Sequence, residues 1–105
     1  MKKIVSALGL LIATAGYAAA TTYPLTIENC GYKETFSKAP ERVVALGQNT
    51  VELLLLLGLE DKVAASAFWP TKVLPELAAK NEKVKTLTVE IPTLESILAQ
   101  NPDFV

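Results

Sequence analysis

The stretch from Pro40 to Val63 reads PERVVALGQNTVELLLLLGLEDKV and indicates the fold of the chain. Val43 to Leu46 is too short for a helix and has no polar face, so it predicts a strand buried on both sides, as in parallel sheets. An apolar helix follows, and Gly58 stands where a left-handed residue would end it. Because this helix is apolar almost all round, we expect the run from Leu53 to Leu57 to lie in the core.

Val63 to Ala67 is a second apolar run of strand length, so the stretch predicts a strand, a helix and a second strand with a right-handed crossover. Upstream, Leu25 to Glu28 and Lys33 to Phe36 flank a turn, which predicts a β-hairpin. The remaining expected elements are a short amphipathic helix within Lys72 to Lys83 that has Pro75 in its first turn, an extended segment from Val84 to Val89, a helix from Pro92-Thr93 through Gln100, and a strand that begins at Asp103. The predicted fold class is α/β, with a Rossmann-like parallel sheet and flanking helices after a β-hairpin.

The N-terminus has the three parts of a Sec-type signal peptide. Met1-Lys2-Lys3 is basic, Ile4 to Ala15 is rich in apolar and small residues, and Ala18-Ala19-Ala20 offers a cleavage site before Thr21. The apolar stretch is shorter than the roughly 20 residues of a membrane-spanning helix, which disfavours the alternative of an uncleaved anchor. We therefore predict a signal peptide over residues 1–20, one lobe over residues 21–105, and a periplasmic location if the source has two membranes.

Charge and composition exclude several classes of function. The chain has 10 basic and 11 acidic residues, and cleavage would remove Lys2 and Lys3, so the remainder is mildly acidic with scattered basic residues. Nucleic-acid binding needs clustered Lys or Arg, so no such partner is expected. Cys30 is the single cysteine and there is no histidine, so we expect no metal site and no cofactor. Cys30 is either a free thiol or pairs with a cysteine outside this sequence. Nucleotide-binding and hydrolase motifs are absent, which argues against an enzyme.

Several motifs together resemble a known family. They are Ala39 to Leu46, Glu52 in its Leu-rich helix, Leu57-Gly58-Leu59, Leu94 to Leu98, and Asn101 to Val105. In this order and spacing they are similar to the N-terminal lobe of periplasmic substrate-binding proteins that serve ABC importers of ferric siderophores and cobalamin. The resemblance runs from about Tyr23 to Val105. Members have two lobes, so it implies a truncated first lobe, although a natural short protein remains an alternative.

Ligands of open α/β sheets bind beyond the carboxyl ends of the strands. Gln48, Asn49 and Thr50 reach that edge with amides and a hydroxyl, although helix capping is an equally simple role for Asn49 and Thr50. Phe68 and Trp69 are adjacent aromatics after the second strand of the sheet, and one should point outward if the other packs on the core. The resemblance implies an aromatic against a bulky ligand here, and Trp69 is our preferred wall residue. The segment from Val89 to Pro92 is a further candidate wall.

The resemblance also implies that Glu95 pairs with arginines on the membrane permease, although a carboxylate in a first helical turn is equally explained by the helix dipole. The function expected is that of an exported solute-binding protein that holds a ferric siderophore, cobalamin or similar chelate between two lobes. It would deliver the chelate to an ABC permease in the inner membrane and act as a monomer at full length. One lobe supplies half a cleft, so weak binding or none is expected of this segment. The alternative is a periplasmic sensory or interaction domain that uses the same half-fold without transport.

Overall fold

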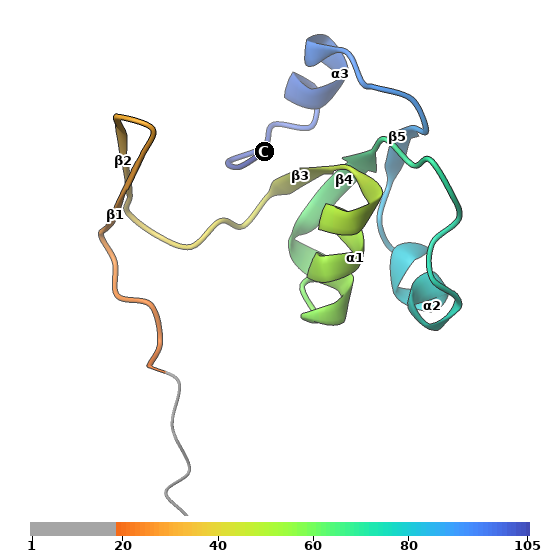
Figure 1. Ribbon diagram of the computed structural model, residues 1–105, viewed down its shortest axis with the longest axis horizontal. Helices are drawn as coiled ribbons and strands as arrows, with labels where there is room; N and C mark the ends of the chain where they lie inside the picture. Colours follow the sequence, from red (N-terminus) through yellow and green to blue (C-terminus); the bar gives the residue numbers. More distant parts are fainter. Residues whose placement is uncertain (1–18) are drawn as a thin grey trace, which may run out of the picture. The chain divides into compact units, whose positions relative to one another are not determined.

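The computed structural model describes residues 19–105, and the chain divides into two compact units between Ser37 and Lys38 (Figure 1). In the first unit, β1 (Leu25–Asn29) pairs antiparallel with β2 (Tyr32–Phe36). The turn between them places Cys30 at φ 50° and Gly31 at φ 76°, as a tight hairpin turn requires. The Cys30 thiol is free and exposed. The predicted hairpin is confirmed, whereas almost all of the predicted signal peptide lies outside the described residues.

The second unit, residues 38–105, contains a parallel sheet in which β3 (Val43–Leu46), β4 (Val63–Ala67) and β5 (Thr86–Thr88) lie in chain order. Phe104 adds a parallel bridge on the other side of β3, where the Val44 N–H donates to the Phe104 carbonyl at 3.0 Å. The chain therefore builds outward from β3 in one direction and then returns to its opposite side. This is the strand order of a Rossmann-like sheet, and the predicted fold class is confirmed.

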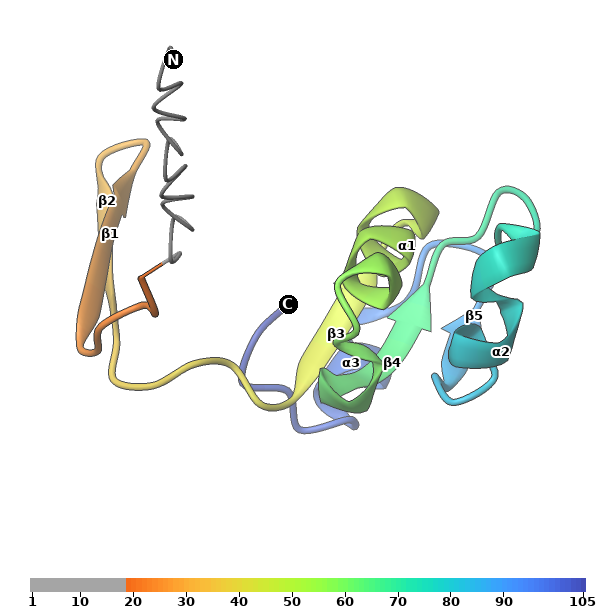
Figure 2. The same cartoon turned by 90° about the horizontal axis from the view of Figure 1, so that it is seen from below.

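Helices cover both faces of this sheet. α1 (Gln48–Leu56) and α2 (Ala78–Asn81) lie on one face and α3 (Leu94–Leu98) on the other, as Figures 1 and 2 show from two directions. Short 3-10 turns, η1 (Glu60–Lys62) and η2 (Pro75–Leu77), precede β4 and α2. The buried cluster under α1 and η2 comprises Ala45, Val51, Leu55, Val63, Leu77 and Val84, and the cluster under α3 comprises Val44, Ala65 and Ile97. Since neighbouring residues Val44 and Ala45 belong to different clusters, β3 is buried on both sides, as predicted.

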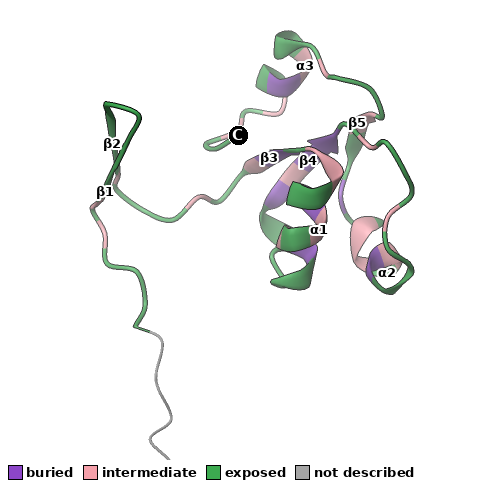
Figure 3. Ribbon diagram, viewed as in Figure 1, coloured by how far each residue is buried: buried purple, intermediate pink, exposed green. Residues whose placement is uncertain are grey.

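The expectation that the whole Leu53 to Leu57 run is core is wrong. Leu55 is fully buried, but Leu53, Leu56 and Leu57 are 57%, 61% and 64% exposed (Figure 3). A helix that lies on a sheet buries the stripe that faces it, which here is Val51 and Leu55 at i, i+4 spacing. An apolar pattern all round predicts burial but does not say which sides have a neighbour to cover them.

The two ends of α1 depend on glycines. At the C-terminus Gly58 has φ 71°, its N–H donates to the Leu55 carbonyl at 3.1 Å, and the Leu59 N–H reaches the Leu54 carbonyl at 3.0 Å. This is a Schellman motif, so the predicted helix stop is confirmed. At the N-terminus the cap residue is Gly47, at φ 95°, and the cap involves no side-chain hydrogen bond. Capping by Asn49 or Thr50 is therefore wrong.

The short helix expected within Lys72 to Lys83, with Pro75 in its first turn, is confirmed. Leu74 has an extended backbone, at φ −53° and ψ 134°, and the helical turns run only from Pro75 to Asn81. The reason is steric, since a residue that precedes proline avoids the helical region. The cap of α3 is confirmed, because the Thr93 hydroxyl accepts from the Ser96 N–H at 3.2 Å. Within residues 19–105, no helix has the length and apolarity needed to cross a bilayer.

Candidate functional site: the carboxyl edge of the sheet

The three segments predicted to reach the ligand lie together at the carboxyl ends of the parallel strands. Backbone hydrogen bonds join them. The Gly47 N–H donates to the Ala67 carbonyl at 2.9 Å. The Phe68 N–H donates to the Thr88 carbonyl at 3.2 Å, and the Trp69 N–H donates to the Val89 carbonyl at 2.9 Å. The strand order reverses at β3, because β4 and β5 follow on one side of it and Phe104 lies on the other. Open α/β sheets bind ligands at such a switch point. We call this region the carboxyl edge.

Phe68 stands directly after β4 with a left-handed backbone, at φ 64°. A bulky residue in this conformation is strained, by about 1–2 kcal/mol relative to ordinary backbone, and such residues concentrate at functional sites. Its side chain is 44% exposed although it is large and apolar. Phe68 is therefore the member of the aromatic pair that is turned toward solvent.

Trp69 is the inward member of the pair. It is partly buried and packs against the cluster under α1, and its indole Nε1–H donates to the Ser66 hydroxyl at 3.1 Å. Ser66 is itself fully buried, so this bond fixes the plane of the ring. One aromatic points outward while its neighbour packs on the core, as the sequence predicts. The preference for Trp69 as ligand wall stays a prediction, and the geometry offers Phe68 as the larger accessible surface.

Gln48 has its carboxamide fully engaged inside the unit. Its Oε1 accepts from the N–H and the hydroxyl of Thr71, at 3.2 and 2.9 Å, and its Nε2 donates to the Lys72 carbonyl and to Glu52 Oε1, both at 3.0 Å. Gln48 is a predicted ligand residue, whereas Glu52 belongs only to one of the family motifs. Their partners Thr71, Lys72 and Leu74 lie more than 20 positions along the chain, and no local pattern in the sequence signals that pairing.

Asn49 and Thr50 are exposed in the first turn of α1. A Cβ on Gly47 would lie 3.1 Å from Asn49 Oδ1, so the Asn49 side chain folds back beside the glycine. Glycine at position 47 thus leaves room for the Asn49 side chain. Both residues have polar groups at the carboxyl edge, and a role in ligand binding stays a prediction for both.

Glu95 is exposed in the first turn of α3, on the face of the sheet opposite α1. α3 begins after the loop that leaves β5. The structure shows no salt bridge of its carboxylate within residues 19–105. Docking of the permease through Glu95 stays a prediction.

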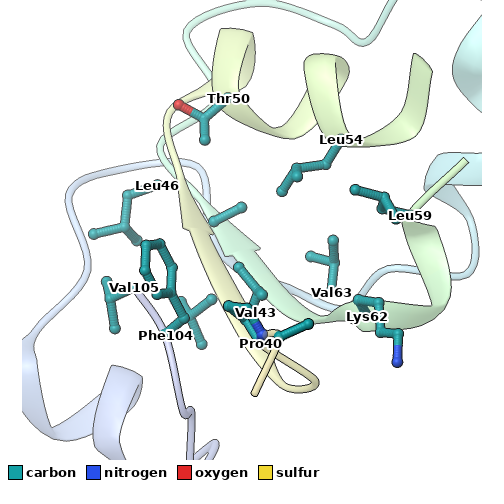
Figure 4. A pocket seen from close by; sticks show the side chains of 13 residues that line it. Pro40, Val43, Leu46, Thr50, Leu54, Leu59, Lys62, Val63, Phe104 and Val105 are labelled. Carbon is teal, nitrogen blue, oxygen red and sulfur yellow. The ribbon is translucent and has the colours of Figure 1, made fainter. Parts of the chain in front are cut away.

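A separate apolar groove of about 680 Å³ runs beside α1, along β3 and Phe104 (Figure 4). It is lined by Ala39, Pro40, Val43, Val44, Ala45, Leu46, Thr50, Leu54, Leu59, Lys62, Val63, Phe104 and Val105. Thr50 is the predicted ligand residue that lines it, at the end nearest the carboxyl edge. The groove follows the flank of the sheet, over a strip that α1 leaves uncovered, and it does not include the aromatic pair.

At the opposite end of the sheet, the charged side chains of Asp103 and Arg42 bind the backbone. Asp103 accepts from the backbone N–H groups of Glu41 and Arg42, at 2.9 and 2.8 Å, and these bonds lower the pKa of its carboxyl. Arg42 Nε donates to the Gln100 carbonyl at 2.5 Å. This clasp fastens the strand at Phe104 beside β3. In the part of the chain that the structure describes, no group of three or more His, Cys, Asp or Glu residues could hold a metal ion.

No protein-family model matches the sequence, and a comparison with curated proteins gives no match. Solved structures do match. A periplasmic binding protein from Veillonella parvula is 36% identical with a TM-score of 0.66, over 76% of this chain and 28% of that one. The ABC-type Fe3+-hydroxamate transport system from Saccharomonospora viridis is 34% identical with a TM-score of 0.60, over 78% of this chain and 31% of that one. The chain thus spans less than a third of the length of these relatives. In sequence and in fold, the chain is similar to one part of the periplasmic binding proteins of ABC transport, the family that its motifs resemble.

Proposed function

We propose that the chain acts in an ABC importer as solute-binding component, or part of one, and takes up a ferric hydroxamate siderophore or a related bulky chelate. The observation that carries this proposal is the strained, exposed Phe68 at the carboxyl edge. A relative of which 31% is matched is described as an Fe3+-hydroxamate transport system, which supports the ligand class. Similarity to binding proteins supports a role without bond chemistry.

The chelate would rest on the aromatic pair. Phe68 would supply an apolar wall, Trp69 would support it from below, and Asn49 and Thr50 would contribute polar contacts. A hydroxamate chelate buries its iron inside an organic shell, so packing and a few hydrogen bonds suffice for recognition. A second wall would come from another lobe. With one wall the expected affinity is weak, with a dissociation constant of roughly 1 mM.

Titration of Trp69 fluorescence with a gallium(III) trihydroxamate chelate tests the ligand, because gallium(III) replaces iron(III) without strong quenching. We expect a saturable change that Phe68→Ser weakens at least severalfold. Leu57→Ser is the matched control, since Leu57 is 64% exposed at the far end of α1. An unchanged response in Phe68→Ser would remove Phe68 from the site, and submicromolar binding by this chain alone would contradict the need for a second wall.

Export is the second part of the proposal. We propose that a Sec-type signal peptide directs the chain to the periplasm and is cleaved after Ala20. The relative from Veillonella parvula is described as a periplasmic binding protein, which supports this location. Mass spectrometry of the periplasmic fraction should find a chain that begins at Thr21. A product that retains Met1 in the membrane fraction would show an anchor instead.

Delivery to the permease is the third part. We propose that the exposed Glu95 carboxylate pairs with cationic side chains of an inner-membrane permease, and that the binding protein docks as a monomer. Glu95→Lys should lower chelate uptake in cells while binding of the gallium chelate stays unchanged. Glu82→Lys, at another exposed position, serves as control. Loss of both uptake and binding in Glu95→Lys would indicate a folding role.

A further inference from the structure

The loop from Phe68 to Leu74 begins with the aromatic pair and contains no helix or strand. Its start is held by backbone bonds from Phe68 to Thr88, the last residue of β5, and from Trp69 to Val89, the residue after it. Beyond Pro70 the backbone leaves the sheet and is mostly exposed. The position of this part of the loop therefore depends on side chains that reach it from other elements.

Gln48 binds the middle of this loop as a neighbouring strand would. Its carbonyl oxygen accepts the Thr71 N–H and its amide donates to the Lys72 carbonyl, so one side chain satisfies a donor and an acceptor of successive residues. These backbone partners fix which end of the carboxamide is oxygen and which is nitrogen. The Thr71 hydroxyl and Glu52 take the remaining capacity of the carboxamide. A glutamine with all its groups paired is held in one orientation.

Glu52 holds the end of the loop. Its Oε1 accepts from the Leu74 N–H at 3.0 Å and from Gln48 Nε2 at the same distance. Hydrogen bonds to a carboxylate are stronger than those between neutral groups. Glu52 lies one helical turn after Gln48, so both side chains project from the same face of α1. Leu74 precedes the 3-10 turn η2, whose N-terminus has no side-chain cap, so Glu52 also fixes the point at which that turn begins.

From this geometry we propose that Gln48 and Glu52 are positioning residues that brace the Phe68–Leu74 loop from the first two turns of α1. The brace holds residues 71–74, which continue the chain from the aromatic pair, in one place before a ligand arrives, so less conformational freedom of the loop is lost on binding. In the proposed function, on which this last step rests, the brace determines the shape of chelate that the wall accepts. Glu52 contacts no ligand in this scheme and acts through the loop.

Amide hydrogen exchange, measured by NMR on the full chain without ligand, tests the brace directly. In Glu52→Ala and Gln48→Ala, exchange at Thr71 and Leu74 should accelerate at least about tenfold, and acrylamide should quench Trp69 more strongly. The Ser66 amide, which donates to the Lys85 carbonyl at 2.8 Å, should keep its protection and so show that the sheet is intact. Glu76→Ala, an exposed glutamate in η2, should change none of these values.

Conservative and backbone variants separate bracing from general stability. Glu52→Gln keeps an acceptor oxygen, so it should restore most of the protection at Leu74. Leu74→Pro removes the N–H that Glu52 accepts, together with a leucine side chain that is 41% exposed, at a residue whose φ of −53° suits proline. It should loosen Thr71 and Trp69 even if Glu52→Ala fails to fold. Unchanged exchange at Thr71 in Leu74→Pro and Gln48→Ala would overturn the proposal.

Titration of the same variants with the gallium chelate then tests the consequence for binding. Gln48→Ala and Glu52→Ala should weaken affinity about tenfold, and Glu76→Ala should not. If exchange accelerates and affinity is unchanged, the brace does not determine recognition and that part is refuted. If the wild-type chain itself does not bind, the proposed function fails while the exchange result still decides the brace.

Discussion

Leu55→Ala should remove a third or more of the stability of the second unit. Leu55 is fully buried and packs in the cluster with Val51, Leu77 and Val84. Each buried CH2 group is worth about 0.8 kcal/mol, so loss of the carbons beyond Cβ costs about 2.4 kcal/mol from transfer alone. The cavity left behind raises the expected loss to about 3–4 kcal/mol.

That loss is large for so small a unit. Residues 38–105 form a unit of about 70 residues, for which stabilities of roughly 3.5–10 kcal/mol are typical. Leu55→Ala should therefore be partly unfolded in buffer, or unfold at a much lower urea concentration. Leu56→Ala is the matched control, because Leu56 is the next residue of the same helix and is 61% exposed. Its cost should stay within about 0.5 kcal/mol.

Urea unfolding followed by Trp69 fluorescence measures both variants, since Trp69 packs against the same cluster. The slope should match that of the wild type, so that the shift in midpoint reports stability. Equal losses for Leu55→Ala and Leu56→Ala would refute the orientation of α1. They would mean that the exposed leucines of α1 have a partner in the folded chain and that the whole run from Leu53 to Leu57 is buried.

Three further predictions concern helix ends and the clasp at Asp103. Gly58→Ala should lower the free energy of unfolding by about 1–2 kcal/mol. The loss comes from backbone strain, because φ is 71° at this position and an added Cβ meets nothing within 4 Å. A loss near zero would contradict the left-handed helix stop. Thr93→Ala should lower the free energy of unfolding by about 1 kcal/mol, because the Ser96 N–H loses the hydroxyl that caps it. Thr93→Ser keeps a hydroxyl and should lower it much less. Equal losses in the two variants would argue against the cap. The folded-state pKa of Asp103 is lowered from 3.8, so its bonds stabilise the fold above about pH 4 and are lost as pH falls through the folded pKa. Asp103→Asn should therefore be less stable than wild type at pH 7, by a difference that shrinks below pH 4 in urea titrations, while a constant difference at all pH values would refute the role of the charge.

Local chemistry explains which parts of the fold were predictable. The short apolar strands, the Gly58 stop and the Thr93 cap each depend on neighbouring residues, and all three are confirmed. The parallel order of the sheet followed because strands joined by helices pair in that way. The exposed side of α1 was not predictable, since whether Leu53 or Leu57 is covered depends on what lies beside the helix.

In the candidate site, too, features that depend on neighbouring residues were predictable, and those that depend on distant segments were not. The position of Phe68 and Trp69 after a strand predicts that they lie at the carboxyl edge, but only the folded structure shows which ring faces solvent. Gln48 was expected at this edge, yet its partners Thr71 and Lys72 are distant in sequence. The expected capping role of Asn49 and Thr50 is wrong, because the cap residue of α1 is Gly47 and the cap involves no side-chain hydrogen bond. Pairings between distant segments are set by the fold as a whole.

The most direct test of the central claim is an NMR map of backbone amide shifts while a gallium(III) trihydroxamate chelate is added to the chain up to millimolar concentration. If the carboxyl edge is the ligand wall, the largest changes should fall on Gly47 to Thr50 and on Phe68 and Trp69. Changes confined to the groove, at Val43, Lys62 and Phe104, or no change at millimolar chelate, would contradict the account.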